Sequence, residues 1–458
     1  MVFSSVPFLY VFLPVVLLGY FLVPRRFKNV VLLAASLFFY YYGERAYTSL
    51  LLISSLSDYL HSLYIEKHRG TQRAKAALIS SIAVNLALLG FFKYADFLIS
   101  TVNSLLRTSI PLLKVPLPIG ISFFTFQTMS YTIDVYRGRV HAQKNLVTMG
   151  TFVCLFPQLV AGPIVRYSDI ALELEQRSTT LDDVSAGARR FVFGLAKKVL
   201  IANNIGLLWD SVHATALPEL SALSAWLGII AYSLQLYFDF AGYSEMSNGL
   251  AALLGFDCPA NFNLPYISGS ITEFWRRWHI TLSGWFRDYI YIPLGGNRKG
   301  QARQLLNMFL VWAATGIWHG ASWNFIAWGL YYFVLLTIEK TFLLKYLKKG
   351  KVWPHIYTLF FVVLGWGIFT ANQPGAPLGL LLQKLFVPQG GISPVYYLRN
   401  YGVLLVLGCV CSSALPHWLW EKISKNTVAK LLVFALLTAL CVCYVVAATN
   451  ATALYANF

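Results

Sequence analysis

Long apolar stretches recur along the whole chain, separated by short polar or basic segments. Runs of transmembrane length lie near residues 6–23, 29–43, 46–65, 75–92, 355–371, 400–416 and 428–449. A run of about 17–25 apolar residues can cross a bilayer as a helix, and a lipid-exposed backbone must satisfy its hydrogen bonds within the segment. The pattern therefore predicts an all-α polytopic membrane protein with about 11–13 transmembrane helices.

Two middle segments are apolar overall but carry polar or helix-breaking residues. Residues 117–135 contain a set of polar side chains, namely Ser122, Thr125, Gln127, Thr128, Ser130, Thr132 and Asp134. Polar residues inside a bundle join helices or line a cavity. Residues 146–165 are interrupted by Pro157, Gly162 and Pro163. Such interruptions occur at membrane depth only where protein or a cavity encloses the backbone, so we expect a broken or re-entrant helix.

The remaining segments are predicted to form elements of several kinds. Residues 91–110 mix charged and apolar positions, as in a helix lying in the outer interface, and residues 166–187 are polar and predict a loop. Residues 187–212 are amphipathic and fit either a span or an in-plane helix, whereas residues 220–255 predict two helices. A Trp-, Arg- and Tyr-rich helix is expected from Glu273 to Gly296, and residues 372–399 predict a Gly/Pro-rich outer loop.

Composition and charge support the membrane class and exclude a nucleic-acid-binding protein. Hydrophobic residues make up 57% of the chain and charged residues only 12%, although the net charge is +17. The cations gather in short loops between apolar segments, as the positive-inside rule predicts for cytoplasmic loops. The basic loops 25–28 and 67–75 therefore place the N-terminus outside the cell, and the first helix is expected to be retained rather than cleaved.

The strongest candidate for chemistry is the segment Thr315–Asn324, which contains His319. A titratable side chain at membrane depth is costly and is a functional-site hypothesis by default. Gly316 and Gly320 allow a close approach of another backbone or a thin acyl chain, and Trp318 supplies an apolar wall. The alternative is a core histidine that hydrogen-bonds between helices.

Further titratable residues support a site. His279 lies in the aromatic, cationic stretch that follows Glu273, and Asp239 and Glu245 lie in an apolar helix. Glu273 is six residues before His279, so the two do not share a helical face. We favour a structural role for Asp239 and Glu245, each paired with a Lys or Arg of a neighbouring helix. A neutral imidazole can act as a general base toward a hydroxyl, because its pKa lies near the physiological range.

These motifs, taken in order, resemble the membrane-bound O-acyltransferases (MBOAT). The match is closest to the bacterial branch that serves alginate and peptidoglycan O-acetylation. It runs through the opening Met1–Ser5, then Leu117–Phe123, Phe156–Ile164, Phe238–Ser244, Glu273–Pro293 and Gly316–Asn324. The resemblance covers about residues 1–345, and the ordered set is far more specific than a Trp-His-Gly triplet alone.

The resemblance implies the fold and the site. It implies a ring of helices, with re-entrant or interfacial segments, around a central tunnel in which His319 is the essential histidine and His279 the second. We expect one integral membrane domain over residues 1–458, with its core near 90–345 and flanking spans in 1–90 and 355–449. Candidate tunnel and donor-binding residues are Trp318, Gly320, Asn324, Arg276, Arg277, Arg298 and Asp239. Arg287 and Lys299 could also attract phosphates, although positive-inside topology explains any single cation equally well.

The resemblance also implies a function. The expected enzyme is an O-acetyltransferase of the bacterial inner membrane that uses no metal and no covalently bound cofactor. It takes an acetyl group from a cytoplasmic thioester, acetyl-CoA foremost, and passes it outward to a partner transferase acting on a polysaccharide. D-alanyl transfer from a carrier protein to teichoic acid is the alternative, and a membrane transporter is the alternative from another class. The ending Leu454–Phe458 raises a further hypothesis, in which Tyr455 carries the acyl group transiently, against a simple role as an interfacial anchor.

Overall fold

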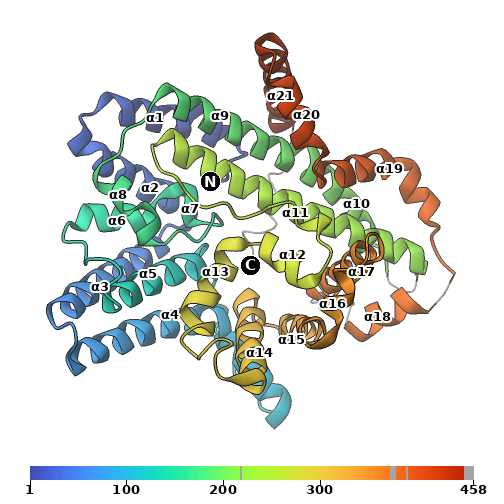
Figure 1. The fold of residues 1–458 in the computed structure, drawn as a ribbon, viewed down its shortest axis with the longest axis horizontal. Helices are drawn as coiled ribbons and strands as arrows, with labels where there is room; N and C mark the ends of the chain where they lie inside the picture. The colour runs from blue at the N-terminus through green and yellow to red at the C-terminus, as the bar shows by residue number, and fades with distance from the viewer. Residues whose placement is uncertain (217–218, 372–377, 388–389, 448–458) are drawn as a thin grey trace. The chain divides into compact units, whose positions relative to one another are not determined.

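The computed structural model describes residues 1–458 apart from 217–218, 372–377, 388–389 and 448–458 (Figure 1). Within the described residues the regular structure is helical, and the only β pairing is one isolated bridge between Leu220 and Ile392. The predicted all-α class is therefore confirmed. Six described helical stretches are long and apolar enough to cross a membrane: Gln72–Leu106, Leu181–His213, Trp323–Leu347, Trp353–Thr370, Pro394–Cys411 and Thr427–Ala447.

The chain divides into two compact units. Unit 1 comprises Met1–Phe191 and Tyr243–Pro259, and unit 2 comprises Val192–Gly242 and the described part of Ala260–Ala456. Each unit is described separately below.

Unit 1 begins with helices that follow the predicted spans. They are α1 (Leu13–Leu22), α2 (Lys28–Glu44), α3 (Tyr47–Lys67) and α4 (Gln72–Leu106). The prediction of a separate interfacial helix over 91–110 was wrong, because α4 continues for 35 residues. Its polar positions are satisfied locally: the Asp96 carboxylate accepts hydrogen bonds from the backbone N–H groups of Leu113 and Lys114. The charged residues therefore secure the segment that follows α4 and do not end the helix.

Helix α5 (Ile121–Tyr136) is the polar segment of unit 1, and nearly all of it is buried. Its side chains join neighbouring helices. Gln127 donates to the carbonyl of Phe152 at 2.9 Å, and Thr128 donates to Oδ1 of Asn85 on α4 at 3.2 Å. Asn85 in turn donates to the buried Asp58 of α3 at 2.7 Å. Of the two expected roles for this polarity, the contacts show the joining of helices.

The predicted break in 146–165 is confirmed. Helix α6 (Leu146–Cys154) stops at Leu155, the short α7 (Phe156–Leu159) follows, and the chain is then irregular up to Arg166. Gly120 lies against this break with φ +78°, and a Cβ there would lie 2.5 Å from the carbonyl oxygen of Leu159. The close approach therefore requires a glycine.

The predicted loop over 166–187 was wrong. It contains α8 (Tyr167–Glu175) and the start of α9 (Leu181–Ala196). A capping box explains the start of α9. The Thr180 hydroxyl accepts from the N–H of Asp183, while the Asp183 carboxylate accepts from the N–H of Thr180. Polar capping residues at the helix start made the segment look like a loop in the sequence.

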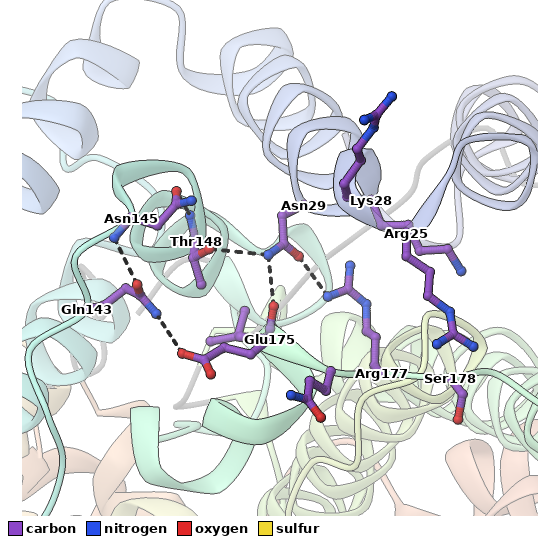
Figure 2. A pocket seen from close by; sticks show the side chains of 12 residues that line it. Arg25, Lys28, Asn29, Gln143, Asn145, Thr148, Glu175, Arg177 and Ser178 are labelled. Atoms are coloured by element: carbon purple, nitrogen blue, oxygen red, sulfur yellow. Dashed lines mark hydrogen bonds between the residues drawn. The ribbon is translucent and has the colours of Figure 1, made fainter.

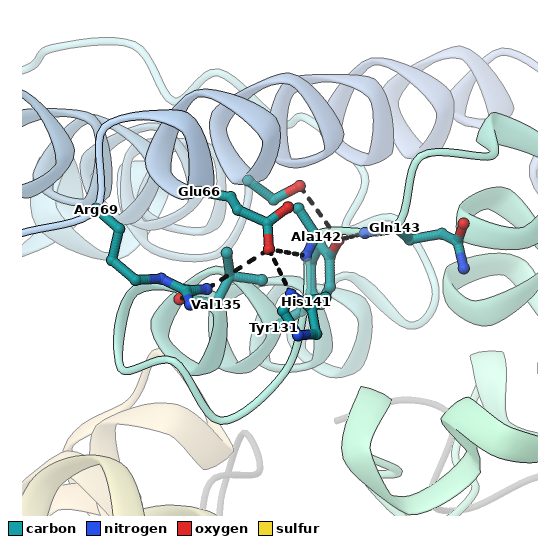
Figure 3. A network of polar contacts seen from close by, with 8 residues as sticks. Glu66, Arg69, Tyr131, Val135, His141, Ala142 and Gln143 are labelled. Atoms are coloured by element: carbon teal, nitrogen blue, oxygen red, sulfur yellow. Dashed lines mark hydrogen bonds and ion pairs between the residues drawn. The ribbon is translucent and has the colours of Figure 1, made fainter.

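The segment between α5 and α6 is held to α3 by Glu66 (Figure 3). The Glu66 carboxylate accepts from Nδ1 of His141 at 2.9 Å and from the N–H of Ala142 at 3.3 Å. Arg69 forms an ion pair with Glu66 and donates to the carbonyl of Val135. One carboxylate at the end of α3 thus anchors a connecting segment.

Two further expectations concern the middle of the chain. Residues 181–213 form one continuous helical stretch through α9, a π-helical segment (Lys197–Ala202) and α10 (Asn203–His213), and this stretch is long and apolar enough to span a membrane. The two helices predicted over 220–255 are a single helix, α11 (Ala222–Leu253). Its glycines are packing positions: a Cβ at Gly249 would lie 2.6 Å from the backbone nitrogen of Phe191.

Unit 2 contains the C-terminal helices. They are α12 (Ile271–Arg277), α13 (Ile280–Phe286), α14 (Gly300–His319), α15 (Trp323–Ile338), α16 (Leu344–Leu347), α17 (Trp353–Thr370), α18 (Leu378–Phe386), α19 (Pro394–Cys411), α20 (Leu415–Ile423) and α21 (Thr427–Ala447). The single helix expected from Glu273 to Gly296 was wrong, because the chain breaks at Trp278 and His279 between α12 and α13. The outer loop predicted over 372–399 also contains a helix, α18.

Helices α14 and α15 are neighbours in the fold and pack closely against each other (Figure 1). A Cβ at Gly316 would lie 2.5 Å from the carbonyl oxygen of Phe325, and a Cβ at Gly329 would lie 2.5 Å from that of Trp312. Paired small residues let two helix backbones approach to this degree. This packing fixes the end of α14, where His319 lies.

Candidate active site

His319 is the last residue of α14 and only 7% of its surface is exposed. Its ring lies edge-to-face against two aromatic rings, with centroid distances of 4.9 Å to Trp328 and 5.3 Å to Phe369. Aromatic rings prefer such edge-to-face geometry, and they keep water from the surfaces they cover. The imidazole is therefore held in a fixed, mostly apolar environment.

The chain turns sharply after His319. Gly320 is extended, with φ −174°, and a Cβ at this position would overlap the ring of Phe325. Asn324, near the start of α15, donates its side-chain N–H to the carbonyl of Phe369 at 2.8 Å. These contacts join the α14–α15 turn to the end of α17, which also supplies Phe369 to the imidazole.

His279 occupies the break between α12 and α13 in a left-handed conformation, with φ 45° and ψ 56°. Its Nδ1 lies 2.9 Å from Oδ1 of Asn261, which also accepts from the hydroxyl of Thr281 at 3.0 Å. Nδ1 donates in this bond, so in the neutral ring Nε2 carries the lone pair. Burial lowers the pKa of His279 to about 3, so the ring is neutral at physiological pH.

One cavity of about 310 Å³ is lined by both His279 and His319. Its aromatic walls include Trp275, Trp278 and Trp312, and the positively charged side chains lining it are Arg276, Arg287 and Lys340. All three cations are exposed, whereas both histidines are buried. The site thus combines a dry end with imidazole bases and a wetter, basic surface that can receive an anion.

The other predicted site residues lie in several places. Arg276 lines the cavity, but among the described residues Arg277 and Arg298 are not part of its lining. Arg277 instead pairs with Glu273 at 2.8 Å, and Arg298 is exposed in the turn before α14. The lining also lacks Trp318, Gly320 and Asn324, which pack around His319.

Asp239 forms a buried ion pair with Lys198 from the π-helical segment of unit 2. This is the contact expected for a structural carboxylate. Tyr455 lies outside the described residues. Among the described residues no group of three or more His, Cys, Asp or Glu side chains is placed to hold a metal ion.

Sequence reasoning did not single out several residues of the site. Asn261 precedes His279 by eighteen positions in an irregular segment, so nothing in the local pattern indicated their hydrogen bond. The cavity-lining side chains of Tyr291, Met308, Trp312 and Lys340 were also missed. The spacing of Met308, Trp312 and His319 along α14 was a usable signal, since positions 4 and 7 residues apart share one helical face.

The chain is similar to proteins of one family over more than half of its length. A model of MBOAT, the membrane-bound O-acyltransferase family, matches residues 37–374. A Pseudomonas putida protein described as a probable alginate O-acetylase is 43% identical over 379 residues, covering 81% of this chain and 78% of that protein. A Helicobacter pylori peptidoglycan O-acetyltransferase is 34% identical, covering 86% and 81%. A Bacillus subtilis teichoic acid D-alanyltransferase is 31% identical, covering 56% and 69%.

Proposed function

The chain belongs to the membrane-bound O-acyltransferase family, and on that premise we propose which group it transfers and to what. It takes an acetyl group from acetyl-CoA on the cytoplasmic side and delivers it for O-acetylation of an extracytoplasmic polysaccharide, together with a partner transferase. The observation that carries the proposal is the single cavity lined by His279 and His319, with exposed cations in the same lining.

His319 acts as the general base in this proposal. An acceptor hydroxyl attacks the carbonyl carbon of the thioester while the imidazole of His319 takes the hydroxyl proton. The tetrahedral intermediate then collapses, the C–S bond breaks, and the proton passes from the imidazolium to the departing thiolate. The aromatic walls limit hydrolysis, because water would compete with the acceptor for the same carbonyl.

His279 plays a different part. Its Nδ1 is engaged with Asn261, and its lowered pKa of about 3 keeps the ring uncharged. A neutral imidazole fixed by a second side chain can accept or donate a hydrogen bond without adding charge to a dry cavity. We therefore assign it the positioning of the acceptor or of the thioester.

Arg276, Arg287 and Lys340 belong to the donor end of the site. Arginine side chains bind phosphate oxygens in bidentate fashion, and lysine adds a point charge. The phosphates of CoA would bind there, while the acetyl thioester reaches inward past the tryptophans. Arg287 is partly neutralised by Asp288 at 2.7 Å, so Arg276 and Lys340 contribute more of the free charge.

Acetyl transfer is favoured over D-alanyl transfer by the extent of the similarity. The alginate and peptidoglycan relatives match 81% and 86% of this chain, against 56% for the teichoic acid relative. The transporter alternative is wrong, because the chain is a member of an acyltransferase family.

The test uses membrane vesicles in which the cytoplasmic face is accessible. Vesicles bearing the wild-type protein and its partner transferase are given labelled acetyl-CoA, and label on polysaccharide is counted. We expect transfer that is lost in His319→Ala and retained in His417→Ala, which removes an exposed histidine of α20. Label that reaches polymer only from a carrier protein charged with labelled D-alanine, and not from acetyl-CoA, would instead establish the teichoic acid reaction.

A further inference from the structure

Unit 1 contains a second cavity, of about 590 Å³, that the proposed reaction does not use (Figure 2). Its lining comes from three places in the chain: the start of α2 and the turn before it, the beginning of α6, and the segment that follows α8. Figure 2 shows polar side chains from all three converging on one space. The cavity is larger than the one that His319 lines.

The charge around this cavity is strongly unbalanced. Arg25, Arg26, Lys28 and Arg177 line it, whereas Glu175 is its only carboxylate. Glu175 accepts a hydrogen bond from Gln143. Within the described part of the chain, none of the four cations forms an ion pair with a carboxylate. Four like charges around one concave space create a positive potential that attracts an anion.

Arg177 is held in place as a binding group would be. Its Nε donates to the hydroxyl of Tyr20 at 2.9 Å, and its Nη1 donates to Oδ1 of Asn29 at 2.7 Å and to the carbonyl of Glu173 at 3.1 Å. The ring of Phe256 lies 4.6 Å from the guanidinium carbon. Nη2 is buried and has no hydrogen-bond partner among the described residues. A guanidinium fixed this way keeps one unsatisfied donor in a residue that lines the cavity, and it has little conformational entropy left to lose when an oxyanion binds.

Exposed leucines lie close in sequence to the charged lining. Leu22, the last residue of α1, is 80% exposed and lies three residues before Arg25, while Leu172 is 81% exposed and lies two residues before the lining residue Leu174. Leu146, 52% exposed, follows Asn145 of the lining. A soluble anion makes no contact with exposed leucines near its site, whereas a phospholipid packs its acyl chains against them. Basic loops next to a membrane helix bind anionic headgroups in this way.

We propose that the Arg25–Arg177 cavity binds a phosphate group, and that the headgroup of an anionic phospholipid supplies it. Arg177, positioned by Tyr20 and Asn29, receives the phosphate oxygens, and Arg25 and Lys28 add charge at the mouth. The acyl chains lie along the exposed leucines of α1, α6 and α8. The site shares no lining residue with the His279/His319 cavity and does not depend on which group the enzyme transfers.

The test is lipid retention by the full-length protein purified in detergent, without donor or acceptor. The protein is mixed with phosphatidylglycerol, with phosphatidylcholine or with inorganic phosphate, and bound species are counted by native mass spectrometry. The test variant is Arg25→Gln/Lys28→Gln, and the matched control is Arg73→Gln/Lys75→Gln. The control also removes two exposed cations of unit 1, from the first turn of α4, but neither lines the cavity. Arg177→Lys tests the guanidinium while keeping its charge.

We expect retention of phosphatidylglycerol but not of phosphatidylcholine, falling about tenfold in Arg25→Gln/Lys28→Gln and less than twofold in the control. Arg177→Lys should also lower retention, and it is compared at equal amounts of folded protein because the change also removes the hydrogen bonds to Tyr20 and Asn29. An equal loss in both double variants would overturn the site and leave only general surface charge. Binding of inorganic phosphate that excludes the lipid would overturn the lipid as its source. Because no acyl transfer is measured, failure here leaves the proposed reaction unaffected.

Discussion

Helix α5 of unit 1 and the His279/His319 cavity of unit 2 both bury polar side chains in apolar surroundings, but they use them differently. In α5 polar side chains bond to the protein, as Gln127 does to the carbonyl of Phe152 and Thr128 to Asn85. In unit 2 the two imidazoles border about 310 Å³ of space walled by tryptophans. Buried polarity alone therefore identifies neither structure nor chemistry. A titratable group that lines a cavity is the better indication of a candidate reaction site.

This difference predicts two kinds of mutant, one with reduced transfer and one with less folded protein. Changes at the cavity should impair transfer with little loss of folded protein, because a cavity-lining side chain has fewer structural contacts to lose. Changes in the α3–α4–α5 network should reduce the amount of folded protein while each folded molecule keeps its activity, because those bonds join helices.

The largest effect is expected from His319→Ala. Removing the general base should lower acyl transfer by about 10²–10⁴-fold while the protein still inserts and folds. The measurement is polysaccharide acetylation in a complementation strain, normalised to protein level by immunoblot. His417→Ala provides the control, because it removes an exposed imidazole elsewhere. Full product from His319→Ala at equal protein level would eliminate the base role.

His279→Asn should reduce transfer less, by about 10–100-fold. Asparagine tolerates the left-handed conformation at this position and can still bond to Asn261, so folding should be kept. The pH–rate profile should keep its wild-type shape between pH 5 and 8, since a group with a pKa lowered to about 3 does not titrate there. A loss as large as that of His319→Ala, or a displaced acid limb, would contradict this ranking.

Asn85→Ala tests the other side of the comparison. It removes the amide that donates to the buried Asp58 at 2.7 Å and accepts from Thr128, and it leaves those groups without these bonds. We expect a loss of about 1–3 kcal/mol in the free energy of unfolding, seen as a lower thermal midpoint in detergent. Activity per folded molecule should stay within twofold. Ser100→Ala, at an exposed position of α4, serves as the control and should do neither.

Much of this arrangement could be predicted from the sequence, and the remainder has definite causes. Apolar length predicted most helices. The motifs around His319 and His279 predicted that both belong to one site, and both line one cavity in the structure, while their part in catalysis stays a prediction. The joined helix α11 was missed because a glycine that packs against a neighbour, as Gly242 does against the carbonyl oxygen of Gly194, looks the same in sequence as a glycine that ends a helix. The break at His279 was missed because its left-handed backbone is stabilised by the distant Asn261.

The positions of the cations were also only partly predictable from the sequence. Arg276, Arg277 and Arg298 were equivalent in the sequence, but only Arg276 lines the cavity, while Arg277 pairs with Glu273. Pairing between residues four apart was visible in the pattern. Which face of the short helix α12 meets the cavity depended on packing against other helices, which the sequence does not display.

The difference between cations that line the cavity and cations that do not gives a further prediction about donor binding, with a smaller expected effect. Arg276→Gln/Arg287→Gln should raise the KM for the thioester donor about tenfold and change kcat less than threefold, because phosphate attraction contributes mostly uniform binding. Arg277→Gln/Arg298→Gln removes the same charge from residues outside the lining and should change KM less than threefold. The two parameters come from initial rates at varied donor concentration. Equal KM changes in both variants would assign the effect to overall charge.

The smallest effect is expected at Glu66, just beyond the predicted span 46–65 in unit 1 (Figure 3). Burial by itself raises the pKa of this carboxyl. The hydrogen bonds from His141 and the Ala142 N–H, with the charges of His141 and Arg69, outweigh burial and lower the pKa below its usual value. A depressed pKa stabilises the fold above the unfolded value of about 4.3, and this contribution is lost as the pH falls through the folded value.

Hydrogen exchange of residues 137–145 should therefore accelerate a few-fold between pH 5 and 3, after correction for the intrinsic rate, and Glu66→Gln should remove the pH dependence. Transfer at pH 7 should be unchanged in that variant, because no atom of the network lines the histidine cavity. If the exchange of this segment in the wild type did not respond to pH, Glu66 would not be its anchor.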